Sequence, residues 1–174
     1  MSTGKTTHKI LFALGLTLGL ASTAAVAQST SQLELKAYLN EPGGPEIMEG
    51  LYADAEELIE TKLSSLKSLD ALVAYNNLCV ARTMLGEFET AELACNAAVR
   101  RAKEMERRTR SRSDRPSATA LNNRAVLSIV QGDFERAIAD LERASPLERS
   151  DRMAQARNLA YIGQLSTQSF AEAE

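Results

Sequence analysis

The chain repeats one short phrase, and this repeat restricts the folds available to it more than any other feature. The first copy places Asn76 and Asn77 ahead of Gly86-Glu87-Phe88, and the second places Asn122 and Asn123 at the same distance ahead of Gly132-Asp133-Phe134. The copies lie 46 residues apart, from position 76 to position 122. Self-similarity at such a spacing is typical of repeat architectures, in which one helix-turn-helix unit stacks on the next. The sequence therefore predicts an all-α stack of antiparallel helical hairpins.

Apolar residues recur at helical spacing on both sides of each Gly-acidic-Phe turn, which predicts a pair of helices around each turn. Either glycine can adopt the left-handed conformation that ends a helix. A third stretch has Asn158-Leu159-Ala160 in the same order as Asn77-Leu78-Cys79, but the polar residues 166–174 after it predict a flexible tail. The expected helices cover residues 72–85 and 88–99 in the first unit, 118–131 and 135–144 in the second, and 152–164 in the third.

This pattern resembles the tetratricopeptide repeat family, which places a small residue midway along its first helix and an Ala in its second, around a Gly-acidic-aromatic turn. The resemblance covers residues 70–99, 118–146 and 152–164, with a degenerate helix from about residue 48, so the repeat domain is expected over 48–165. It implies a right-handed α-solenoid of about 2.5–3 repeats. The copies are spaced more widely than the family's 34 residues, which predicts a second helix extending beyond Val99. Arg124 stands where the family has Leu.

The resemblance also implies that residues of the first helix of each unit line a concave face. Paired Asn side chains suit an extended peptide, because a carboxamide can donate to and accept from a main chain. The alternative is that Asn77 and Asn123 only bridge helices within the stack. A binding face also requires Asn76, Asn122 and Arg157 to be exposed. The expected face consists of Val73, Asn76, Asn77, Val80, Thr83, Thr119, Asn122, Asn123, Val126, Ile129, Arg157, Asn158 and Tyr161.

The first 27 residues have the features of a bacterial export signal. A positive start is followed by an apolar run from Ile10 to Leu20 and by the small-x-small site Ala25-Val26-Ala27. The sequence predicts cleavage after Ala27 and a periplasmic product without stable membrane insertion; an uncleaved anchor is the alternative. Residues 28–47 are expected to be a partly ordered lead-in, in which residues 32–39 could form a short helix before the Pro- and Gly-rich break at 41–45.

The composition of the predicted mature chain argues against several function classes. The full chain has 20 Lys and Arg, 23 Asp and Glu and one His, and loss of Lys5, His8 and Lys9 leaves 18 − 23 = −5 and no His. No catalytic, cofactor or metal site is therefore predicted, and nucleic acid is not the expected partner. A glycan hydrolase built on acidic residues such as Asp54, Glu56 and Glu57 is an alternative, but these carboxylates fit a solvated surface better.

Two charged stretches and two cysteines leave further questions open. Residues 100–115 are basic and residues 41–60 are acidic, so the basic strip could dock an anionic partner or a second copy, although a solvated helix extension is favoured. The expected register pairs position 79 with position 91, so Cys79 and Cys95 are expected as two buried thiols rather than a disulfide. The leading functional prediction is an exported adaptor or scaffold that binds a protein or peptide; the alternative is a structural subunit that self-associates.

Overall fold

The computed structural model describes residues 33–109, 115–144 and 152–171. In these ranges the chain forms seven helices and no strand, so the predicted all-α class is confirmed there. The predicted export signal, residues 1–27, lies outside the described residues.

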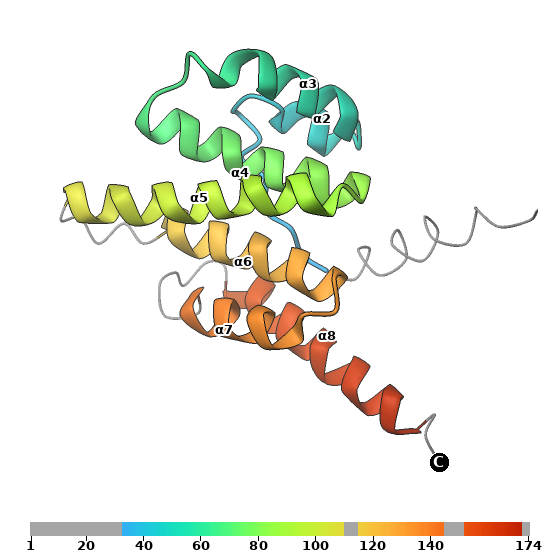
Figure 1. Cartoon of the computed structure of the whole chain (residues 1–174). Coiled ribbons are helices and arrows are strands. Elements are labelled where there is room, and N and C mark those ends of the chain that lie inside the picture. Colours follow the sequence, from blue (N-terminus) through green and yellow to red (C-terminus); the bar gives the residue numbers. More distant parts are fainter. Residues whose placement is uncertain (1–32, 110–114, 145–151, 172–174) are drawn as a thin grey trace, which may run out of the picture.

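Each helix packs against its neighbours in sequence from α2 to α8 (Figure 1). The first helices of the successive units also contact one another, α4 with α6 and α6 with α8. These three helices therefore share one side of the molecule. The helices are α2 (Gly44–Met48), α3 (Tyr52–Leu63), α4 (Ser68–Leu85), α5 (Phe88–Thr109), α6 (Arg115–Val130), α7 (Phe134–Ala144) and α8 (Arg152–Ala171).

The two repeated turns have the same backbone geometry. Gly86 ends α4 with φ of 77° and Gly132 follows α6 with φ of 80°, both in the left-handed region that glycine adopts without steric cost. At each turn the next residue donates its N–H back into the helix, from Glu87 to the Arg82 carbonyl (2.9 Å) and from Asp133 to the Ser128 carbonyl (2.8 Å). The predicted glycine turns are confirmed.

Two helices run further than their local pattern alone indicates. Helix α5 continues past Val99 to Thr109, as the wide spacing of the repeated phrase predicts. Helix α8 continues past Gln164 to Ala171, into the stretch expected as a tail. No Pro or Gly lies between Gln164 and Ala171 to end the helix.

The first hairpin, α4–α5, is closed by a disulfide between Cys79 and Cys95, whose Cα atoms are 4.8 Å apart. The expectation of two separate thiols is wrong. Both cysteines lie eight residues from Glu87, at 87 − 8 and 87 + 8. Because both helices rise by about 1.5 Å per residue, positions equally distant from the turn lie level with each other.

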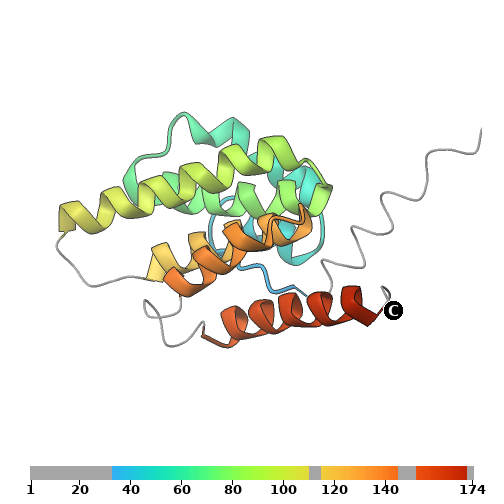
Figure 2. The ribbon, with the colours of Figure 1, turned by 60° about the horizontal axis from the view of Figure 1, so that its bottom comes forward.

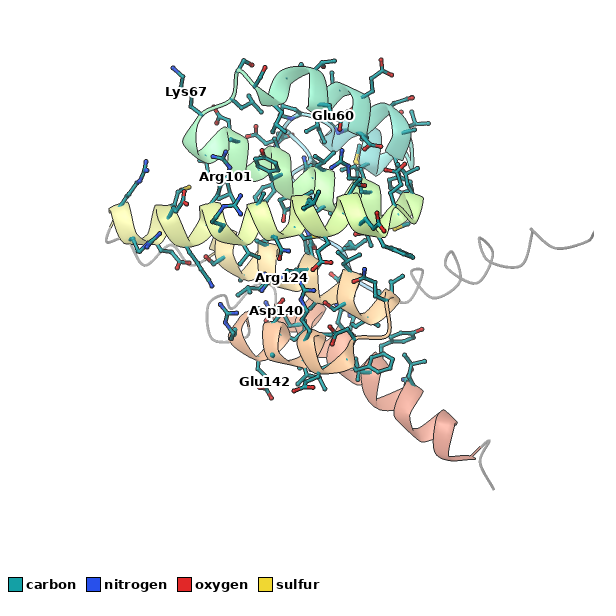
Figure 3. All side chains as sticks on the ribbon, in the orientation of Figure 1. Glu60, Lys67, Arg101, Arg124, Asp140 and Glu142 are labelled. Carbon is teal, nitrogen blue, oxygen red and sulfur yellow. A yellow bond between two sulfur atoms is a disulfide. The ribbon has the colours of Figure 1, made fainter. Side chains whose placement is uncertain are left out.

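The second hairpin, α6–α7, is joined by an ion pair in the equivalent region (Figure 3). Arg124 donates from Nε and Nη2 to the two carboxylate oxygens of Asp140, at 2.7 and 2.8 Å, and from Nη1 to Asn96 on α5 at 2.9 Å. Asp140 is buried. Arg124, which stands where the sequence resemblance predicts Leu, therefore has a structural partner, and its bond to Asn96 links α6 to the preceding hairpin.

Candidate functional site

The side of the molecule shared by α4, α6 and α8 is covered by a segment of the same chain that directly precedes α2. Residues 33–42, here called the inner segment, form no helix and cross these three helices before α2 begins (Figures 1 and 2). The short helix considered for residues 32–39 is therefore absent from residues 33–39. Apolar Leu33, Leu35 and Ala37 alternate with Glu34, Lys36 and Tyr38, a period-two pattern typical of extended backbone.

Three asparagines each bind both main-chain groups of one residue in the inner segment. The Oδ1 of Asn77 accepts from the N–H of Tyr38 (2.8 Å) and its Nδ2 donates to the Tyr38 carbonyl (3.0 Å). Asn123 binds Lys36 in the same way, at 2.8 and 2.7 Å. The third pair is Asn158 with Glu34, at 2.9 and 3.2 Å. The contacted residues are two apart, so they share one edge of the extended backbone.

The other two repeated asparagines add to this arrangement. Asn76 donates to the Lys36 carbonyl (2.9 Å) and Asn122 to the Glu34 carbonyl (2.8 Å). Their oxygens accept from the asparagines of the next helix, Asn123 at 3.1 Å and Asn158 at 3.0 Å. Helix bridging, the alternative that the sequence offers for Asn77 and Asn123, is therefore present at Asn123, whereas the bonds of Asn77 go to Tyr38 and Pro42. We call these five residues, Asn76, Asn77, Asn122, Asn123 and Asn158, the asparagine face.

Side chains of the inner segment also contact the stack. Leu33 is buried in one apolar cluster with Val126 and Ile129 of α6 and Ile162 of α8, and Leu35 packs against the same cluster. The carboxylate of Glu34 accepts from Nη1 of Arg157 at 2.6 Å, and the Arg157 side chain remains mostly exposed. Main-chain, apolar and ionic contacts therefore all hold this segment.

The structure brings most of the predicted face together but does not leave it open. Asn76 and Asn122 are each only 1% exposed, so the expectation that they are accessible to solvent is wrong. The inner segment covers them. Arg157 is exposed as expected, and Tyr161 is half-buried beside the Leu33 cluster.

The remaining predicted residues have less direct roles. Val73, Val80 and Thr119 are buried. The Thr83 hydroxyl donates to the Cys79 carbonyl of its own helix at 2.7 Å, so its polar group is used internally.

A compact turn connects the inner segment to α2. Asn77 Nδ2 also donates to the Pro42 carbonyl (3.1 Å), and the N–H of Glu41 donates to the Tyr38 carbonyl (3.2 Å). A Cβ atom at Gly44 would lie 2.3 Å from that same carbonyl oxygen, so only glycine fits there. The sequence analysis does not predict that the inner segment is part of the site. The alternation of apolar and polar residues over 33–38 is the sequence pattern that indicates its extended backbone.

The basic strip forms a second candidate surface. An open hollow of about 470 Å³ lies along α5 and reaches Arg124; its lining residues are Asn96, Val99, Arg100, Lys103, Glu106, Arg107 and Arg124. Arg124 is already paired with Asp140, and Glu106 accepts from the Ser117 hydroxyl. The free charge in this hollow therefore belongs mainly to exposed side chains on α5.

The acidic residues considered for catalysis, Asp54, Glu56 and Glu57, all lie on α3. Glu56 accepts from Nε of Arg82 at 2.7 Å, and Glu60 pairs with the same guanidinium. Asp54 and Glu57 are exposed on α3. These contacts give the α3–α4 interface a structural ion pair.

Comparison with known proteins gives no match: no family model, curated protein or solved structure aligns significantly with the chain. Among the helices of the described ranges, none combines the length and apolar character needed to cross a membrane.

Proposed function

We propose that this protein is an exported interaction module of tetratricopeptide type, an adaptor or scaffold that binds an extended peptide segment at the asparagine face. On this proposal the helices form a right-handed solenoid of about 2.5–3 repeats, and the face is its concave side. The observation that carries the proposal is the geometry of Asn77, Asn123 and Asn158. Each presents one acceptor and one donor to the main chain of a single residue.

Main-chain recognition suits a binding module because every non-proline residue carries one N–H donor and one carbonyl acceptor. The asparagines therefore supply affinity for extended backbone without requiring a particular side chain. Selectivity comes from the neighbouring groups, the apolar cluster at Val126 and Ile129 and the charge of Arg157. This division of labour resembles other extended-peptide modes, in which main-chain bonds give affinity and side-chain pockets give specificity.

Export to the periplasm is part of the same proposal. The disulfide between Cys79 and Cys95 supports it, because disulfides persist in oxidising compartments such as the periplasm. The partner is accordingly a protein or peptide of the cell envelope. The proposal includes no enzymatic activity, cofactor or nucleic-acid partner.

Site-specific photo-crosslinking in whole cells tests the proposal. A photoreactive phenylalanine analogue replaces Tyr161, at the rim of the asparagine face, or Arg107, in the basic strip, as the matched control. We expect a foreign protein to be crosslinked from position 161 and not from position 107. A foreign protein crosslinked from position 107 and not from position 161 would show that the partner binds the basic strip instead. Crosslinks to further copies of this chain alone would favour the self-associating structural subunit.

A further inference from the structure

The asparagine face is fully engaged by the inner segment. Its five side chains accept three main-chain N–H bonds and donate six bonds to carbonyl oxygens of residues 34–42. An external peptide cannot use the same donors and acceptors at the same time. A partner that binds this face must first displace the segment.

We propose that residues 33–39 are a resident, displaceable ligand, and that the external partner is an extended segment with the same chemical pattern. This inference rests on the proposed function and specifies its partner. The pattern has apolar side chains at the positions of Leu33 and Leu35 and a carboxylate at the position of Glu34. The main chain is read at every second residue, 34, 36 and 38.

The direction of the partner chain is also defined. The inner segment meets Asn158 of α8 at Glu34, Asn123 of α6 at Lys36 and Asn77 of α4 at Tyr38. Its amino-terminal end therefore lies at α8 and its carboxyl-terminal end at α4. A partner segment that enters with the opposite direction exchanges the positions of its N–H and carbonyl groups. The carboxamides of Asn123 and Asn158 would then have to flip, and they would lose their bonds to Asn76 and Asn122.

The connection to α2 allows the segment to leave without unfolding the hairpins. The helices α4–α5 and α6–α7 are held by their own disulfide and ion pair. None of these contacts involves residues 33–39. Because the tether through residues 40–45 keeps the released segment nearby, its effective concentration is on the order of millimolar. The resident segment therefore outcompetes partners that bind the asparagine face weakly and is displaced by partners that bind it tightly.

A fluorescent peptide of residues 33–41, blocked at both ends, is the probe, and fluorescence anisotropy with the full-length protein is the measurement. The double variant Leu33→Ser/Leu35→Ser weakens the apolar hold of the resident segment. We expect it to bind the probe at least about tenfold more tightly than the wild type, since apparent affinity scales with the fraction of open face. Leu93→Ser on α5 is the control because Leu93 is 71% exposed and lies outside the inner segment, and it should behave like the wild type.

A charge exchange tests the register of the bound peptide. In the opened double variant, Arg157→Glu or a probe carrying Lys at position 34 should each weaken binding several-fold, the scale of an exposed ion pair. Combining the two changes should restore most of the affinity. If the combination binds no better than the single changes, the proposed direction and register are wrong.

Other outcomes would overturn the proposal. A folded double variant that does not bind the probe would make the inner segment a permanent part of the core. If the wild type and the double variant bind the probe with equal affinity, the inner segment does not compete with the probe for the asparagine face. If light scattering shows that the opened variant dimerises through its segment, the occupant is a second copy and not a foreign partner.

Hydrogen exchange on the wild type gives a test that needs no variant. The amides of Glu34, Lys36 and Tyr38 should exchange faster than the core amides of α4, because the segment opens without global unfolding. Equal protection of both sets would overturn the proposal. Crosslinking from position 161 to a foreign protein would still support the proposed function in that case, so the two failures are distinguishable.

Discussion

The hairpins α4–α5 and α6–α7 carry the same phrase but join their helices in different ways. Both present an asparagine pair and turn at a left-handed glycine. In the first hairpin Leu78 and Ala94 are apolar, and the adjacent Cys79–Cys95 disulfide crosses the seam. The second hairpin has Arg124 and Asp140 at the positions of Leu78 and Ala94, 46 residues further on.

The comparison shows that the asparagines are the same in both hairpins, whereas the contacts that join the two helices differ. Both hairpins have asparagines at these positions, and their carboxamides bind the main chain of the inner segment. The seam only requires that two helices stay in register. A covalent bond meets this requirement in the first hairpin and a bidentate ion pair in the second, where Ala125 and Leu141 fill the cysteine positions. Each of the following substitutions removes, exchanges or overpacks a contact that joins the two helices of a hairpin.

The largest effect is expected from Asp140→Ala in the second hairpin. The substitution leaves the Arg124 guanidinium inside the seam without its carboxylate, and breaking a buried pair by removing one partner costs about 3–5 kcal/mol. Urea unfolding monitored by circular dichroism measures the change. The control is Glu142→Ala on the exposed side of α7, which should change stability by less than about 0.5 kcal/mol. A loss below about 1 kcal/mol would show that the ion pair does not hold this hairpin.

Removing the disulfide should have the next largest effect. Cys79→Ala/Cys95→Ala opens a loop whose ends are 16 residues apart, and closure of such a loop stabilises by about 3 kcal/mol. The free energy of unfolding should fall by that amount, and a reducing agent should lower the stability of the wild type but not of the double variant. A wild type insensitive to reduction, with thiols that react freely in the unfolded state, would contradict the disulfide.

A smaller loss is expected from overpacking the second seam. Ala137 is fully buried, so Ala137→Leu forces extra methylenes between α6 and α7 and should cost about 1–3 kcal/mol. The melting temperature should fall by several degrees. Ala139→Leu, on the exposed side of the same helix, is the matched control and should not shift it. An unchanged melting temperature for the buried variant would mean that the helices are not paired as described.

The smallest effect is expected when the ion pair of the second hairpin is replaced by the apolar residues found at the equivalent positions of the first. Arg124→Leu/Asp140→Ala removes both charges together, and replacing a whole buried pair by apolar residues is often neutral or stabilising. The free energy of unfolding should therefore stay within about 1 kcal/mol of the wild type or rise. A loss as large as that of Asp140→Ala alone would show that the loss does not come from an unpaired Arg124 charge, because the double variant has no such charge.

The sequence predicts several parts of the fold because their signals are local. Helical periodicity indicated the helices around Gly86 and Gly132, and the wide spacing of the phrase indicated the extension of α5. The disulfide was missed by an error of register: the turn is centred at Glu87, which places Cys79 level with Cys95 rather than with Ala91. The positions of the candidate binding residues on the first helices were also readable, since they repeat with the phrase.

The helices, the glycine turns and the placement of the asparagines on the helices follow from local sequence patterns, because each depends on residues a few positions apart. The groups that those asparagines bind are known only from the folded chain. The bonds from Glu34 to Asn158 and from Tyr38 to Asn77 span 124 and 39 residues, and no local pattern encodes such a pairing. Main-chain groups are nearly the same in every residue. The sequence of a face that binds main-chain groups therefore does not indicate which segment it will bind.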